Sequence, residues 1–259
     1  MSDTTLHPAG TTPLAWIAGV GASAGLGAAL GRRFARGGFT VVLTGRTEER
    51  VAAVATQIRD QGGQAIALAA DVTSETELAE VARELRELGQ LRCAVFNAGN
   101  AVRGPTLELT VEQIDSAWRT NVLGGFVFAR AALPLLLDAP DAMRAPTGAG
   151  SLIFTGATAS LRGRPPFAAF AAAKAGLRSL SQSLAREFGP RGVHVAHTVI
   201  DGGIDGERLR SGSPQRAEQA GADGLLQPEA IADSYWQLHH QHRSAWTQEL
   251  DLRPWSESF

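Results

Sequence analysis

Short apolar runs alternate with longer amphipathic segments along most of this 259-residue chain. The runs that predict β-strands are Leu14–Gly19, Thr40–Thr44, Ala65–Ala70, Leu91–Phe96, Ser151–Thr155, Val193–Ile200 and Ala245–Leu252. The segments that predict helices are Leu26–Arg36, Thr47–Asp60, Glu75–Leu88, Phe167–Phe188, Pro228–His240 and, as one helix or as two interrupted near Gly124-Gly125 and Pro134, Val111–Leu137. Strands that alternate with helices form a parallel sheet with right-handed crossovers. The chain is therefore predicted to be an α/β protein with a doubly wound parallel sheet.

The patterned region contains no linker and no internal repeat, so we expect a single domain over residues 13–259. Residues 1–12 are polar and are expected to form a flexible N-terminus. The segment Arg208–Leu226 is polar and has no clear periodicity. We expect a mobile loop there, placed to cover a ligand at the carboxyl ends of the strands.

The composition argues against several classes of protein. A net charge of -2 does not suit a nucleic-acid surface built on bulk positive charge. The single cysteine, Cys93, excludes an internal disulfide and a multi-cysteine zinc site, and its apolar neighbours predict a buried thiol. We expect no metal site. Polar residues or glycines interrupt the long apolar stretches, and no basic segment precedes Leu14–Leu30, so a cytoplasmic protein without membrane contact is expected.

A glycine-rich turn, Gly19-Val-Gly21-Ala-Ser-Ala-Gly25-Leu-Gly27, joins the first predicted strand to the first predicted helix. Glycines at such a turn let backbone amides approach a phosphate, and the helix that follows directs its positive end toward the same group. Glycine turns are common, but this position in the chain favours the binding of a dinucleotide.

The end of the second predicted strand indicates which dinucleotide. An NAD site places an acidic side chain there, which accepts a hydrogen bond from the ribose 2′-hydroxyl. This chain has Thr44-Gly45-Arg46, and a guanidinium suits the 2′-phosphate of NADP, so NADP(H) is expected rather than NAD(H). The alternative for Arg46 is a solvated loop residue. Asp71, after the third strand, either meets the adenine amino group or caps the helix that begins at Glu75.

Lys174 is the only lysine among 24 Lys and Arg residues, and Phe170 precedes it by one helical turn. Asn97-Ala98-Gly99 follows the fourth strand, and Asn121-Val122 lies in the next predicted helix. Together with Gly21-x3-Gly25-x-Gly27, the order and spacing of these motifs resemble the short-chain dehydrogenase/reductase family.

The resemblance spans Leu14–Leu252 and implies a Rossmann fold, NAD(P)-dependent oxidoreductase activity on a small molecule, and a homo-oligomer, either a dimer or a tetramer. In that family the lysine holds the nicotinamide ribose and the asparagine supports a water relay. These roles fall on Lys174 and Asn121. The segment 243–255 then forms the last strand and an intersubunit contact. The other positions that the resemblance assigns to the cofactor are Gly21, Ser23, Gly25, Leu26, Gly27, Asp71, Val72, Asn97, Ala98, Gly99 and Ile204.

Two positions depart from the family pattern. The family has a proton-transferring tyrosine four residues before the lysine, and a serine 13 residues before that tyrosine positions the carbonyl. Here these positions are Phe170 and Ala157, which offer neither an ionisable proton nor a hydroxyl and are expected to line the substrate pocket. The enoyl-reductase variant has its tyrosine seven residues before the lysine, and that position is Phe167. The only tyrosine, Tyr235, is expected in the core or at an interface, far from the nicotinamide.

Several polar residues are candidates to replace the missing groups. Thr155, Thr158 and Ser160 lie near the serine position, but a hydroxyl is a poor acid and suits polarisation of a carbonyl better than proton donation. Asp201 follows the sixth strand, where the family usually has proline. It is either a desolvated carboxyl that acts as an acid or a turn residue that accepts backbone amides. His197, on the same strand, is expected to be structural.

Two functions are consistent with these residues. The first is an atypical NADP(H)-dependent oxidoreductase for an apolar carbonyl, alcohol or activated alkene, with Asn121, Lys174, Asp201 and Thr158 as catalytic candidates. The second is a non-catalytic NADP(H)-binding module, a sensor or an assembly subunit, which the absence of both the tyrosine and the serine favours. The retained Asn121 and Lys174 favour the enzyme, because a protein that only binds the cofactor needs them least.

Overall fold

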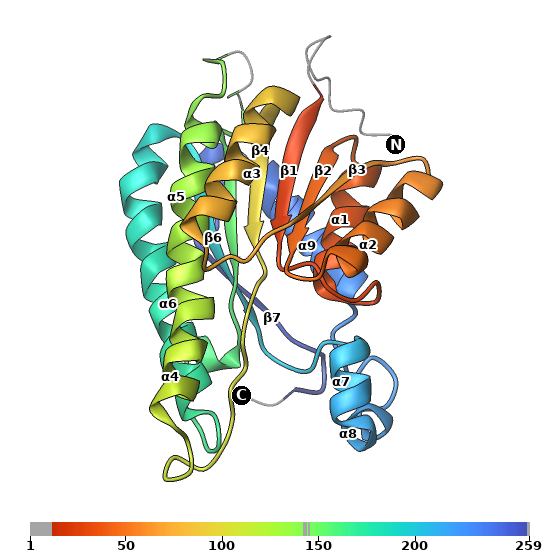
Figure 1. Ribbon diagram of the computed structural model, residues 1–259, viewed down its shortest axis with the longest axis vertical. Helices are drawn as coiled ribbons and strands as arrows, with labels where there is room; N and C mark the ends of the chain where they lie inside the picture. Colours follow the sequence, from red (N-terminus) through yellow and green to blue (C-terminus); the bar gives the residue numbers. More distant parts are fainter. Residues whose placement is uncertain (1–11, 142–143, 145, 258–259) are drawn as a thin grey trace.

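A computed structural model of the chain describes residues 12–141, 144 and 146–257 (Figure 1). The predicted flexible terminus, apart from Thr12, lies outside the described residues. Within the described part of the chain, seven parallel strands form one sheet in the order β3-β2-β1-β4-β5-β6-β7. The strands are β1 (Pro13–Ala18), β2 (Thr40–Gly45), β3 (Gln64–Ala69), β4 (Gln90–Phe96), β5 (Gly150–Thr155), β6 (Val193–Ile200) and β7 (Glu249–Leu252).

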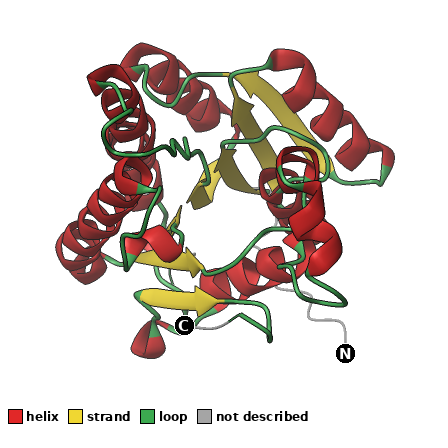
Figure 2. Cartoon of the chain, turned by 90° about the horizontal axis from the view of Figure 1, so that it is seen from below, coloured by secondary structure: helices red, strands yellow, loops and turns green. Residues whose placement is uncertain are grey.

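Helices cover both faces of the sheet (Figures 1 and 2). One face carries α1 (Leu26–Arg36), α2 (Glu48–Asp60) and α9 (Pro228–His240). The other carries α3 (Glu75–Leu88), α5 (Gly124–Leu137) and α6 (Ala168–Phe188). Each interface between sheet and helices holds a buried apolar core, with Tyr235 in the first and Trp16 in the second. Because both faces are covered, the residues of β1, β2 and β5 are buried along the whole strand rather than alternately. The predicted doubly wound α/β fold is confirmed.

One continuous helix occupies residues 111–137, where one helix or two were predicted. α4 (Val111–Trp118) passes into α5 through a π-helical turn at Arg119–Leu123. The irregularity thus lies one turn before the predicted break at Gly124-Gly125, and Pro134 stays inside α5. Among the described residues this helix is the one long and apolar enough to cross a membrane, but 56% of its apolar window is buried, as in a core helix.

The segment Arg208–Leu226 differs from the prediction of an unpatterned loop, because it contains the short helices α7 (Glu207–Gly212) and α8 (Pro214–Gln219). Helices of this length have too few turns to show an apolar face in the sequence. Their position is set by tertiary contacts instead, since Ile204 forms a parallel bridge with Leu226 across the base of the segment. Both helices lie near the carboxyl ends of the strands (Figure 1).

The last strand is shorter than predicted. A 3-10 turn at Arg243–Ala245 precedes it, and Trp246 then stacks on the ring of His194 from β6, so pairing with β6 begins only near Glu249. The boundaries of the other strands and of α1, α2, α3, α6 and α9 agree with the prediction to within one residue.

Candidate active site

The glycine turn begins where the strand order reverses, between β1 and β4. Gly19 has a φ of +87°, and a Cβ atom there would lie 2.4 Å from the backbone nitrogen of Ala98, so only glycine fits. A Cβ on Gly27 would lie 2.8 Å from the carbonyl oxygen of Gly19. Asn97 donates a hydrogen bond from Nδ2 to that same oxygen over 3.1 Å. The motifs after β1 and β4 therefore pack against each other at the point where the strand order reverses.

The middle of the turn borders open space. No atom lies within 4 Å of a Cβ placed on Gly21. In the part of the chain that the structure describes, the backbone amides of Gly21 and Ser23 form no hydrogen bond, while Gly25 and Leu26 begin α1. Free amides in front of a helix fit an anionic phosphate group. The residues present thus suit the diphosphate of a dinucleotide.

The positions predicted to contact the adenosine lie beside this turn. Arg46 follows β2 directly and is exposed. Asp71 accepts hydrogen bonds from the backbone and the hydroxyl of Thr73, each over 2.8 Å, and Val72 is buried beside it. The helix cap predicted as one role for Asp71 is instead made by Ser74, whose hydroxyl accepts from the α3 backbone. Asp71 therefore orders the turn before α3 rather than the helix start.

Lys174 lies on the face of α6 that is turned to the sheet and is only 4% exposed. Its Nζ donates a hydrogen bond to the carbonyl oxygen of Thr155 over 2.8 Å and lies 5.8 Å from the centre of the Phe170 ring. Burial, and next the charge of Arg208, lower the pKa of Lys174 to about 7. An amine with this pKa exchanges protons readily at neutral pH.

Asn121 lies in the π-helical turn and is fully buried. Its Nδ2 donates to the carbonyl oxygens of Ala117 and Asn100 over 2.8 and 3.0 Å, whereas its Oδ1 is buried without a partner. A Cβ on Gly99 would lie 3.2 Å from this Oδ1 and 3.5 Å from Lys174 Nζ. The structure thus brings together the predicted asparagine, lysine and glycine, with an unsatisfied acceptor beside the amine.

Ala157 and Phe170, the two positions predicted to line the substrate pocket, lie just after β5 and in the first turn of α6. Ala157 follows β5, and its backbone amide donates to the buried Ser160 hydroxyl over 3.1 Å, so Ser160 orders the turn. Thr155 Oγ1 forms a hydrogen bond of 2.9 Å with the Tyr235 hydroxyl of α9, on the opposite face of the sheet. Tyr235 is fully buried, and burial raises its pKa to about 12. The core position predicted for Tyr235 is confirmed, and Ser160 and Thr155 are occupied structurally.

Thr158 and Asp201 form a pair at the carboxyl ends of β5 and β6. Thr158 Oγ1 donates to Asp201 Oδ1 over 2.5 Å, and Asp201 is 1% exposed. The other carboxylate oxygen lies 3.6 Å from guanidinium nitrogens of Arg162 and Arg253. Asp201 therefore contacts side chains rather than the turn amides of the alternative interpretation. Ile204, three residues later, is half-buried at the base of the α7 segment.

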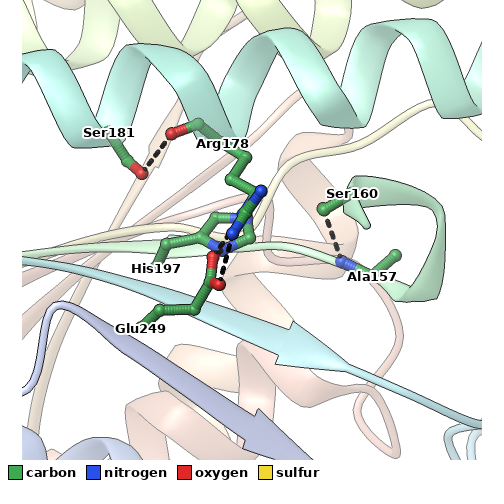
Figure 3. A network of polar contacts seen from close by, with 6 residues as sticks. All are labelled: Ala157, Ser160, Arg178, Ser181, His197 and Glu249. Atoms are coloured by element: carbon green, nitrogen blue, oxygen red, sulfur yellow. Dashed lines mark hydrogen bonds and ion pairs between the residues drawn. The ribbon is translucent and has the colours of Figure 1, made fainter. Parts of the chain in front are cut away.

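His197 belongs to a network that the sequence did not indicate (Figure 3). Its Nδ1 lies 3.0 Å from Glu249 Oε2, and Arg178 binds both oxygens of Glu249 over 2.6 and 2.7 Å. Burial lowers the pKa of His197 to about 4, so the ring is neutral at neutral pH. A Cβ on Gly156 would lie 2.3 Å from His197 Nε2, so this ring occupies the side-chain space of Gly156. The structural role expected for His197 agrees with this packing.

Comparison with known proteins assigns the family. The family model described as short chain dehydrogenase matches residues 15–216. The chain belongs to the short-chain dehydrogenase/reductase family. One similar curated protein is a short-chain dehydrogenase/reductase from Hericium erinaceus, 33% identical over 67% of this chain and 68% of that protein. Another is an A-factor type gamma-butyrolactone 1′-reductase from Streptomyces virginiae, 35% identical over 68% of this chain and 66% of that protein. The alignments thus span about two thirds of these relatives.

Solved structures share the short-chain dehydrogenase/reductase fold over nearly the whole chain. A short-chain dehydrogenase from Rhodopseudomonas palustris is 36% identical, with a TM-score of 0.76 over 94% of this chain and 99% of that chain. A metagenomic short-chain oxidoreductase in complex with NADP is 26% identical, with a TM-score of 0.74 over 93% of this chain and 97% of that chain. Nicotinamide dinucleotides are the cofactors typical of this family.

Proposed function

We propose that the chain is an atypical NADP(H)-dependent oxidoreductase that acts on a small, apolar carbonyl, alcohol or activated alkene. The observation that carries this proposal is the convergence of Asn121 Oδ1 and Lys174 Nζ on Gly99, in the motif after β4 that packs against the start of the glycine turn. A buried amine beside an unsatisfied amide oxygen is costly unless a ligand or a reaction uses it.

The turn after β1 and Arg46 support NADP(H) as the proposed cofactor. The free amides of Gly21 and Ser23 would hold the diphosphate, and the exposed Arg46 would pair with a 2′-phosphate. The similar metagenomic oxidoreductase is in complex with NADP, which favours the same cofactor here. When bound, the nicotinamide supplies or accepts the hydride.

We propose that Phe170 and Ala157 occupy the positions of the family's tyrosine and serine. Another group must then give or take the proton that accompanies hydride transfer. Lys174 is the first candidate. Its pKa of about 7 lets it give or take a proton near neutral pH, and Asn121 Oδ1 can accept a hydrogen bond from the amine or from a water between them. The aromatic ring of Phe170 would form an apolar wall beside this amine.

Thr158 and Asp201 are the second candidates for proton transfer with the substrate. The Thr158 hydroxyl donates a hydrogen bond to Asp201, so its lone pairs remain to accept a hydrogen bond from a substrate hydroxyl. In the oxidation of an alcohol, Thr158 would take the alcohol proton while passing its own to Asp201. This geometry suits an acceptor of protons better than a donor.

The phenylalanine and alanine at the positions proposed for the family's tyrosine and serine favour a second candidate function, an NADP(H)-binding module without turnover. The test measures NADPH oxidation with a panel of ketones, enones and a γ-butyrolactone bearing a ketone, the last because of the similar reductase from Streptomyces virginiae. If the protein is an enzyme, at least one substrate is turned over, and the rate falls by about 10²-fold or more in the Asn121→Ala, Lys174→Ala variant. Tight NADPH binding with no turnover above that variant would favour the binding module.

The exposed stripe Val111, Ile114 and Trp118 on α4 supports the further proposal of a homo-oligomer, a dimer or a tetramer, since apolar surface of this kind marks subunit contacts. Sedimentation of the purified chain tests this directly, and a monomer at micromolar concentration would contradict it.

A further inference from the structure

The segment between β6 and α7 is fixed at its base. The backbone amide of Asp205 donates to the carbonyl oxygen of Leu226, and the amide of Leu226 donates to the carbonyl oxygen of Gly203, each over 2.8 Å. Asp205 also binds Arg210 through both carboxylate oxygens, over 2.6 and 2.9 Å. The first turn of α7 therefore has a defined position relative to the sheet.

That position is beside the glycine turn. A Cβ on Gly206 would lie 3.2 Å from the carbonyl oxygen of Ala24 and 3.9 Å from the Cα of Gly25. Gly206 is itself buried, so the chain passes directly over the turn before α7 begins. The backbone that leads into α7 therefore lies against the end of the glycine turn that suits a diphosphate.

Arg208 lies in the first turn of α7, and after burial its charge is the second cause that lowers the pKa of Lys174. The other charged groups near Lys174 are compensated or neutral, because Arg178 of α6 is held by Glu249 of β7 and His197 of β6 is uncharged at neutral pH. Within the described residues, Arg208 itself forms no salt bridge. The exposed guanidinium of Arg208 thus disfavours the charged form of Lys174, and an anion bound near both side chains would offset this repulsion.

We propose that Arg208 is an anion-binding residue of the cofactor site, which pairs with the diphosphate held by the glycine turn. This inference rests on the proposed function, since it requires a dinucleotide in the site. A bound diphosphate would lie beside the glycine turn, against which Gly206 packs, and Arg208 follows Gly206 by two residues and influences the charge of Lys174. Arg208 would thereby direct the first turn of α7 toward the cofactor rather than toward the substrate.

The test uses cofactor affinity, which does not depend on turnover. Kd is measured by fluorescence titration for NADPH and NADH, and by competition for ADP-ribose and adenosine 2′-phosphate. Arg208→Ala should weaken NADPH, NADH and ADP-ribose by a similar factor of about 10 to 100 and leave adenosine 2′-phosphate unchanged. Arg216→Ala, which removes the same charge from the exposed part of α8, is the matched control and should change none of the four.

Two results would overturn the proposal. The first is an Arg208→Ala variant that binds ADP-ribose as tightly as the Arg216→Ala control does. The second is unchanged affinity for the cofactors with a raised KM for an anionic substrate, which would assign Arg208 to the substrate. Loss of ADP-ribose affinity in a protein without turnover would support the role of Arg208 while contradicting the proposed enzyme, so the two failures are distinguishable.

Discussion

Lys174→Met tests the buried amine through the stability of the protein. Burial lowers the pKa of Lys174 from 10.5 to about 7, so the unfolded chain binds a proton that the folded chain releases between these pH values. Stability therefore rises with pH from about 7 to 10.5, and below pH 7 the folded state holds an unfavourable buried charge. This penalty amounts to roughly 5 kcal/mol at pH 6 and to roughly 2 kcal/mol at pH 9.

Methionine has a similar length and no charge, so the variant avoids the penalty. It loses the hydrogen bond from Nζ to the carbonyl oxygen of Thr155, which costs roughly 1–3 kcal/mol at every pH. The variant without cofactor should thus be more stable than the native chain at pH 6, and its advantage should shrink by roughly 3 kcal/mol by pH 9.

Urea unfolding of both proteins, followed by circular dichroism at several pH values, gives the difference in unfolding free energy directly. Groups that do not interact with residue 174 contribute equally to both proteins and cancel in that difference, and the pKa of His197, which Lys174 lowers, lies below this pH range. A difference that stays constant within about 0.5 kcal/mol from pH 6 to 9 would show that Lys174 keeps an ordinary pKa, and the reasoning about its environment would be wrong.

Three further predictions concern other residues. Arg46→Ala should weaken NADPH by about 10-fold or more and leave NADH unchanged, and equal weakening of both would contradict the 2′-phosphate assignment. Phe170→Tyr combined with Ala157→Ser should raise ketone reduction by about 10²-fold, and no gain would mean that these positions are not those of the missing groups. The low pKa of His197 makes the folded chain less stable as pH falls from 6.5 toward 4, because the histidine takes up a proton in the unfolded chain first. His197→Asn keeps a donor toward Glu249 and should remove this acid sensitivity, worth up to roughly 3 kcal/mol, in unfolding at pH 4.5 and 7.

The sequence predicted the regular elements well because their signals are local. Gly37 follows α1, and Gly189-Pro190 follows α6, so both helices end where the pattern indicates. The helices α7 and α8 are too short to show an apolar face, and the bridge between Ile204 and Leu226 holds the segment in place. The π-helical turn also escaped prediction, because it depends on the packing of a continuous helix rather than on a breaking residue.

The candidate site was predictable where motif spacing carries it. Asn121 and Lys174 were expected to lie together, and the structure places both beside Gly99. The pairing of His197 with Glu249 was not predictable, because it depends on the register of β6 against β7, between residues 52 positions apart. The role of Arg208 required the folded position of α7, which the sequence pattern does not show.

The single lysine makes one measurement decisive for the central claim that Lys174 lies in a cofactor site. Lysine labelled with ¹³C at Cε produces one NMR resonance from this chain, which reports Lys174 without assignment. If Lys174 is buried beside bound NADPH, this resonance titrates near pH 7 in the free protein and shifts on addition of NADPH until the site is saturated. A resonance that titrates near 10.5 and does not respond to NADPH would contradict that claim.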